Sequence, residues 1–300
     1  MGYTPKKKYP WYSNSDYNNS ILSENYSKWM SYIDDTINVK NLSIPGTHNS
    51  CSSKFKDPNN KVVKFRMIDQ SWSIKDQLKA GIRYFDLRPG KDYMIYHSIY
   101  STIYSLNQTL EEMINFLKKY PSEFLFVRFQ FTNGTCGDMD LEKCRNIYLN
   151  SILSKYYKYF YVKKNFPQIG LLRGKIYPFI EYTEFRNLTQ WRSYKKKHFL
   201  LQDKFKFKGM VYILRPFYLK KKRKLINLYL SEKDPDKKKL ILNHCSMQNK
   251  RIKSTPPFVS FVTNEVVYKS NKLRGILIFD FPSELLIKHV INSNKLNAKL

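Results

Sequence analysis

Short apolar runs alternate with helical patterns along most of the chain. The first runs cover residues 41–45, 82–87 and 123–131, and each is apolar almost throughout before polar residues follow. Runs of this kind are typical of strands that are buried on both faces of a parallel sheet. Later runs have the same character, at 173–180, 197–202, 209–217 and 274–281.

The segments between these runs have the spacing of amphipathic helices. Residues 74–80 place Leu78 on an apolar side before Gly81, which predicts the end of a helix. In the next helix we expect Thr109 and Glu112 to form a capping box, with Pro121 ending the helix. Six or more strand and helix units in one chain predict an α/β fold, a TIM-type irregular β/α barrel in a single domain.

The length and composition agree with one large domain. The chain has 300 residues, of which 42% are hydrophobic, so it can bury a sizeable core. Residues 1–22 are polar, aromatic and basic without periodicity and predict a flexible arm, which leaves 23–300 for the barrel. Neither a signal peptide nor a membrane-spanning run is evident, so we expect the protein in the cytoplasm or at the membrane periphery. We also expect it to be a monomer.

The charge of the chain indicates a polyanionic partner but does not identify which one. Lys and Arg number 53 against 24 Asp and Glu, a formal net charge of +29. Such a protein is attracted to polyanions, and both nucleic acid and an anionic lipid surface qualify. An AT-rich coding bias would account for part of the excess. The basic run 218–224 is interpreted as a solvated loop.

The four cysteines are widely spaced and form no CxxC pair. This spacing indicates neither a zinc site nor a dense disulfide framework. Reduced thiols are the expectation.

Unusual polar residues follow three of the early strands. Pro45-Gly46 is interpreted as a turn that holds His48 at the carboxyl end of its strand, Asp86 and Arg88 end the next, and His97 follows a third. Asp86 and Arg88 are two residues apart, so both point into the barrel, where charges need a partner or a charged ligand. Two imidazoles beside a guanidinium are the parts of a metal-free phosphoryl-transfer site.

The order of these motifs resembles the phosphatidylinositol-specific phospholipase C X-domain family of bacterial type. The similar blocks are "LSIPGTHNS", "QSWSIKDQLKAGIRYFDLRPG", "MIYHSIYS", "FPQIGLLRGKIYPF", "LLQDKFK" and "GILIFDFP". They span roughly residues 28–295. The resemblance implies an enzyme that cleaves phosphatidylinositol or glycosylphosphatidylinositol into diacylglycerol and a cyclic inositol phosphate, with no metal or other cofactor.

The resemblance also implies a role for each motif residue. His48 would be the general base and His97 the general acid, while Arg88 would take the place of the calcium used by animal relatives. Asp86 would orient its neighbours and Asp280 would support His48. Two further positions imply substrate contacts, Asp203 to inositol hydroxyls and Phe205 to the face of the ring.

Some positions depart from the bacterial pattern. Asn49 stands where bacterial members have an aspartate that pairs with the second histidine, although protozoan members resemble this chain there. Gln130 and Glu181 replace an acidic and a basic inositol contact, and Ser98 replaces a glycine. The expected substrate-binding set is therefore Asn49, Asp203, Phe205, Gln130 and Glu181, with the head-group preference left open.

Two other classes of protein compete with the enzyme. Asn49, Glu181 and the basic excess suggest a catalytically weakened barrel that only binds anionic membranes. The charge and the 24 tyrosines suggest nucleic-acid binding, but no recognised motif for that purpose is present and none is expected as a partner. The joint presence of His48, Arg88, His97 and Asp280 favours the enzyme.

Overall fold

A computed structural model describes most of the chain. The described residues are 24–90, 92–132, 136, 138–163, 165–180, 189–190, 198–207, 215–230, 239–247 and 255–297. The expected arm at 1–22 lies outside them, as does most of the expected strand at 209–217.

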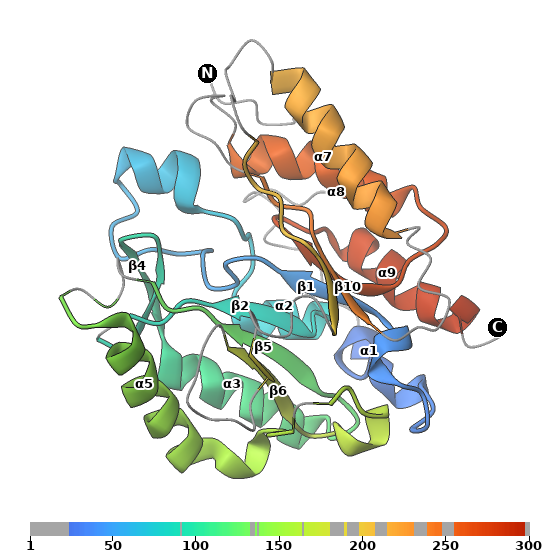
Figure 1. Cartoon of the computed structure of the whole chain (residues 1–300), viewed down its shortest axis with the longest axis horizontal. Helices are drawn as coiled ribbons and strands as arrows, with labels where there is room; N and C mark the ends of the chain where they lie inside the picture. Colours follow the sequence, from blue (N-terminus) through green and yellow to red (C-terminus); the bar gives the residue numbers. More distant parts are fainter. Residues whose placement is uncertain are drawn as a thin grey trace.

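Eight parallel strands form the central sheet. Their order is β7-β6-β5-β2-β1-β10-β9-β8, and every neighbouring pair runs parallel. The bounds are β1 Ser43–Thr47, β2 Tyr84–Leu87, β5 Leu125–Phe129, β6 Ile176–Ile180, β7 Thr189–Gln190, β8 Phe199–Gln202, β9 Leu240–His244 and β10 Gly275–Phe279. The sheet curls into a barrel-like wall (Figure 1), and β7 and β8 end its order, so no strand pairing closes it within the described residues. This irregular β/α barrel confirms the predicted fold class.

Helices follow most of the strands and cover the outside of the sheet. The α-helices are α1 Glu24–Ser27, α2 Ile74–Ala80, α3 Leu106–Lys119, α5 Leu141–Tyr156, α7 Arg215–Leu230, α8 Pro256–Tyr268 and α9 Glu284–Asn297. In Figure 1, α3 and α5 lie beside β5 and β6, whereas α7, α8 and α9 group at the other end of the sheet. In the described part of the chain, no helix combines the length and apolar character needed to cross a bilayer.

Shorter elements fill the connections. A hairpin of β3 Met94–His97 and β4 Tyr100–Ser105 precedes α3. The short helices are η1 Trp29–Tyr32, η2 Val39–Asn41, η4 Tyr157–Tyr159 and η5 Ile169–Leu171, all 3₁₀, and the π-helix η3 Val63–Met67. The hairpin and η3 matter most for function, because each contributes to the placement of His97.

Two helix predictions need correction. The cap of α3 is Ser105, whose side chain accepts a hydrogen bond from the backbone of Gln108, so the expected capping box at Thr109 and Glu112 is wrong. Thr109 is already inside the helix, where its hydroxyl donates to the carbonyl of Ser105 over 2.8 Å. The basic run 218–224 is part of α7 rather than a loop.

Pro45 and Gly46 lie within β1 and do not form the expected turn. The strand continues to Thr47, and the carbonyl of Pro45 accepts from the backbone of Arg83 over 2.9 Å. Gly46 allows a close approach, because a Cβ atom there would lie 2.8 Å from Cβ of Tyr84 on β2. His48 still follows the strand directly, as predicted.

Aromatic rings fill the barrel interior below the strand ends. Tyr84, Phe126, Phe179 and Phe199 are all buried. The rings of Phe126 and Phe179 stack at 5.1 Å, and Phe179 lies 6.2 Å from Tyr84 and 5.6 Å from Phe199. Tyr84 and Phe126 lie two residues before Asp86 and Arg128 on β2 and β5, and therefore on the same strand faces, so the aromatic rings form an apolar layer beneath the polar side chains.

A disulfide overturns the expectation that all thiols are reduced. Cys136 and Cys144 are joined, and both are buried. The bond fastens the segment that follows β5 to the first turn of α5. Cys51 and Cys245 are free and buried.

Candidate active site

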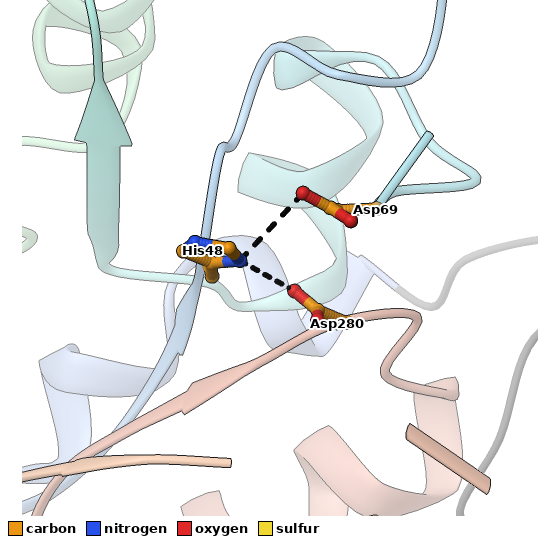
Figure 2. Close-up of side chains that lie close together, drawn as sticks. All are labelled: His48, Asp69 and Asp280. Atoms are coloured by element: carbon orange, nitrogen blue, oxygen red, sulfur yellow. Dashed lines mark hydrogen bonds and ion pairs between the residues drawn. The ribbon is translucent and has the colours of Figure 1, made fainter. Parts of the chain in front are cut away.

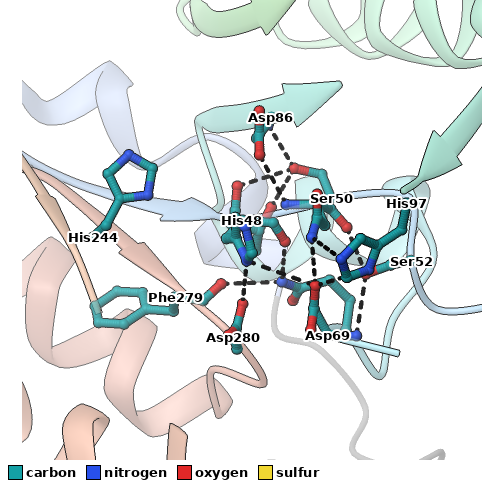
Figure 3. A network of polar contacts seen from close by, with 12 residues as sticks. His48, Ser50, Ser52, Asp69, Asp86, His97, His244, Phe279 and Asp280 are labelled. Atoms are coloured by element: carbon teal, nitrogen blue, oxygen red, sulfur yellow. Dashed lines mark hydrogen bonds and ion pairs between the residues drawn. The ribbon is translucent and has the colours of Figure 1, made fainter. Parts of the chain in front are cut away.

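Backbone contacts between neighbouring strands fix the position of His48. Its N–H donates to the carbonyl of Phe279 at the end of β10, over 3.0 Å. The side-chain amide of Gln70 donates to the carbonyls of both His48 and Phe279, over 2.7 and 3.0 Å. Figure 3 shows His48 and Phe279 in one polar network at the carboxyl ends of the strands. His48 therefore enters the site from a rigid backbone.

Both ring nitrogens of His48 have partners. Nδ1 lies 2.8 Å from Oδ1 of Asp280 (Figure 2), and Nε2 lies 3.0 Å from Nη2 of Arg88. Since a guanidinium can only donate, Nε2 carries a lone pair and Nδ1 carries the hydrogen. Burial would lower the pKa of His48, but Asp280 and Asp69 outweigh it and raise that pKa above its ordinary value. The ring thus has the form and the proton affinity of a general base.

Asp86 holds Arg88 in place from below. Nη2 of Arg88 lies 3.0 Å from Oδ2 of Asp86, which also accepts from the backbone N–H of Asn49 over 3.2 Å. Asp86 is fully buried, and Nη1 of Arg128 lies 3.8 Å from its other oxygen. Burial opposes ionisation, yet Arg88 and Arg128 hold the pKa of Asp86 well below its usual range. Asp86 is therefore a carboxylate that orients cations.

His97 faces His48 from the end of β3. The two ring centroids are 6.4 Å apart, and Nδ1 of His97 lies 2.8 Å from the carbonyl of Met67 in η3. Ser98 follows with a positive φ of 58°, a conformation that glycine adopts more easily. Burial and Arg88 lower the pKa of His97 to about 3. The ring therefore needs a nearby negative charge if it is to hold a proton.

A cavity of about 170 Å³ opens over these side chains. His48, Arg88, His97 and Asp280 line it, which brings together four of the five expected catalytic residues. Asp86 is buried behind Arg88. The expected substrate contacts Asp203, Phe205 and Gln130 also line the cavity.

The two remaining expected contacts have other positions. Asn49 is buried among Asp69, Asp86 and His97 and is absent from the cavity wall. It adopts a positive φ of 44°, which asparagine tolerates better than most residues. Glu181 lies outside the described residues.

Three titratable residues of the cavity were missed by sequence reasoning. Arg128 interrupts the apolar run of β5, and His244 is the last residue of β9, much as His48 directly follows β1. The sequence pattern could therefore have indicated both residues. The ring of His244 lies 6.4 Å from that of His48, and burial lowers its pKa to about 4. Asp69 lies in a connection without a periodic pattern, so nothing in the sequence indicated it.

One cluster in the described part of the chain has the composition of a cation site. Ligand atoms of His48, Asp69 and Asp280 lie within 4.8 Å of one another. However, Nδ1 of His48 already donates a hydrogen bond to Asp280, and the guanidinium of Arg88 lies on the other side of the ring. A divalent cation would compete with that hydrogen and be repelled by Arg88. We assign the cluster to proton binding.

Known proteins share the fold of this chain and about three in ten of its residues. No family model matches the chain. It is 30% identical over 310 residues to the 1-phosphatidylinositol phosphodiesterase of Listeria monocytogenes, across 95% of this chain and 91% of that protein. The solved phosphatidylinositol-specific phospholipase C from Listeria monocytogenes matches with a TM-score of 0.76 and 28% identity, covering 90% of this chain and 98% of that one. The Staphylococcus aureus 1-phosphatidylinositol phosphodiesterase is 29% identical over 174 residues, 55% of this chain and 54% of its own.

The chain belongs to the phosphatidylinositol-specific phospholipase C family. This confirms the resemblance stated from the six motifs.

Proposed function

We propose that this protein cleaves the phosphodiester of inositol phospholipids without a metal ion, releasing diacylglycerol and an inositol phosphate. The arrangement of His48, Arg88 and His97 around one cavity carries the proposal. One ring is positioned to take a proton, the other is positioned across the cavity, and a fixed cation lies beside the first.

Each step uses a group that the site holds. Nε2 of His48 removes the proton of the inositol 2-hydroxyl, whose oxygen attacks the phosphorus and forms the cyclic ester. The bond from phosphorus to the diacylglycerol oxygen breaks, and that oxygen takes a proton from His97. Arg88 neutralises a non-bridging phosphate oxygen as charge develops on it. Asp280 keeps His48 oriented, and Asp86 keeps Arg88 oriented.

Release of the cyclic product would leave His48 protonated and His97 neutral. Water can then attack the phosphorus and open the cyclic ester, with the two histidines exchanging their acid and base roles. His97 accepts a proton from the water, and His48 returns a proton to the 2-oxygen. The second step gives the linear inositol phosphate.

The cavity is suited to a single sugar ring. Its volume of about 170 Å³ leaves little room beyond one ring and its phosphate. Asp203 and Gln130 offer hydrogen bonds to ring hydroxyls, and Phe205, 47% exposed, lies where it can stack on the ring. Glu181 is proposed as a further contact from outside the described residues. Any glycan of a glycosylphosphatidylinositol would extend outward.

We also infer that the monomer works at an anionic membrane surface. The net charge of +29 favours such a surface. Lys220, Lys221 and Lys224 are exposed on α7, near the exposed ring of Phe217. Basic and aromatic side chains together are typical of peripheral membrane binding.

Incubation of purified protein with phosphatidylinositol, a glycosylated analogue and phosphatidylcholine tests the proposal. Soluble phosphate should appear from the inositol lipids and not from phosphatidylcholine. His48→Ala and His97→Ala should each lose about 10²- to 10⁴-fold of the turnover. His289→Ala, a matched change on α9 that leaves the cavity intact, should retain it. Vesicle binding without turnover would instead indicate the catalytically weakened barrel.

A further inference from the structure

The carboxylate of Asp69 lies between the two histidines. Its Oδ2 atom is 3.3 Å from Nδ1 of His97 and 3.6 Å from Nδ1 of His48. The same oxygen accepts a hydrogen bond from the side-chain amide of Asn49 over 2.6 Å. Asp69 is 1% exposed, so these contacts form away from bulk water.

Backbone hydrogen bonds fix Asp69 on both sides. Its N–H donates to the hydroxyl of Ser52 over 3.2 Å, and its carbonyl accepts from the N–H of Phe281 over 2.9 Å. Gln70, the next residue, holds the backbone of His48. The segment therefore ties the end of β1 to the end of β10, and the carboxylate has a defined place between them.

Asn49 cannot supply the charge that His97 needs. Its amide nitrogen lies 3.2 Å from Nε2 of His97, and an amide is neutral at any working pH. His97 is buried in a site that also holds Arg88, so an uncompensated imidazolium there would be costly. Asp69 offers a carboxylate within 4 Å of this ring.

We propose that Asp69 is the positioning carboxylate that both catalytic histidines share, taking over for His97 the charged role that Asn49 cannot fill. Asp69 contacts Nδ1 of His97 directly and holds Asn49 against the opposite nitrogen of the same ring. The inference rests on the proposed function, because it assigns the support of that reaction's acid.

The surroundings of Asp69 couple its charge to that of His48. Burial and the nearby Asp280 raise its pKa well above the usual range, whereas His48, the Asn49 amide and Arg88 act in the opposite direction. A carboxylate in this position ionises most readily when an imidazolium is beside it. Asp69 can therefore compensate a proton on His48, and its 3.3 Å contact with Nδ1 of His97 offers the same charge to the second ring.

An exchange of residues tests the proposal. Asp69→Asn should lower kcat on phosphatidylinositol by about 10²-fold or more, with KM changed by only a few-fold, because the acid loses its counter-charge. The exchange Asn49→Asp/Asp69→Asn returns a carboxylate beside His97 and should recover at least about 10-fold of that loss. Asp57→Asn, an exposed change in the same connection between β1 and α2, should have no effect.

Two outcomes would overturn the proposal. The first is a kcat for Asp69→Asn within about three-fold of the unaltered enzyme. The second is an exchange variant no faster than Asp69→Asn. Thermal melts check folding, and Asp69→Ser replaces Asp69→Asn if the latter does not fold.

A substrate-free measurement separates this proposal from the proposed function. The pKa of His48, followed by ¹⁵N NMR, should fall in Asp69→Asn because one of the two carboxylates that raise it is gone. Asp280 and Arg88, which also face His48, are unchanged in that comparison. An unaltered pKa would refute the role of Asp69. If the unaltered protein cleaves no inositol lipid, the proposed function fails while the titration still decides on Asp69.

Discussion

Nη2 of Arg88 lies 3.0 Å from Nε2 of His48, so the guanidinium and the proposed base are in direct contact before substrate enters. The substrate phosphate must reach both groups, since the 2-hydroxyl has to face Nε2 while a phosphate oxygen faces the guanidinium. Binding would therefore replace the contact between Arg88 and His48 with two contacts to substrate. That replacement aligns the reacting atoms around two residues that are already adjacent.

Arg88 should make the reaction independent of divalent cations. We expect full activity in excess EDTA, because a fixed guanidinium stands beside the base. Arg88→Ala should cost about 3–4 kcal/mol of transition-state stabilisation, and Arg88→Lys less, since Lys keeps the charge but loses the planar fork. The measurement is kcat/KM with and without chelator, with Arg223→Ala on α7 as the control. Loss of activity in EDTA and its return with calcium would refute this role.

The acid limb of the pH profile should depend on Asp280. His48 must be neutral to act as the base, and its folded pKa is raised above the ordinary 6.5, so kcat/KM should rise as pH increases through that higher value. Asp280→Asn removes the strongest influence that raises this pKa, and the limb should move to lower pH. The maximal rate should also fall, because Nδ1 loses a charged partner that can only accept a hydrogen bond, and the amide can stabilise the other tautomer of the ring. A limb that stays in place would show that another group controls it.

Membrane binding should weaken steeply with salt. The exposed lysines of α7 act through charge, and the Debye length falls to about 8 Å at physiological ionic strength. Changing Lys220, Lys221 and Lys224 together to Gln should reduce sedimentation with anionic vesicles. The matched control changes Lys79, Lys118 and Lys119 on α2 and α3. Vesicle binding that does not change with salt concentration would mean that insertion of apolar side chains into the membrane dominates.

The disulfide should contribute measurably to stability. Replacing Cys136 and Cys144 with Ser frees a short loop in the unfolded chain and should lower the free energy of unfolding by about 2–3 kcal/mol. A urea titration measures the loss, and dithiothreitol should reproduce it in the unaltered protein. Cys51→Ser separates the effect from that of removing a buried thiol. Equal stability with and without reductant would contradict the prediction.

The sequence predicted several of the site residues that lie at strand ends, although Arg128 in β5 and His244 in β9 were missed. Apolar runs mark strands because burial on both faces excludes polar residues, so the strand-end positions of His48, Arg88 and Asp280 could be inferred without a structure. Asp69 could not be inferred, because its position depends on contacts with Ser52 and Phe281 that bring distant segments together. The turn expected at Pro45-Gly46 was wrong for a similar reason. Pro-Gly favours a turn locally, but here the packing of Gly46 against Tyr84 keeps both residues in the strand. Tyr84 belongs to the neighbouring strand, so this contact cannot be inferred from the local sequence.

Gly46 has a consequence for how variants of this protein are interpreted. It lies two residues before His48, and the residue that crowds it, Tyr84, lies two residues before Asp86. A methyl group at position 46 would push β1 and β2 apart and widen the gap between base and cation, although no reacting group had changed. In a screen for lost activity, Gly46→Ala would resemble the replacement of a catalytic residue. Position 46 thus sets the spacing of the active site while remaining outside its chemistry.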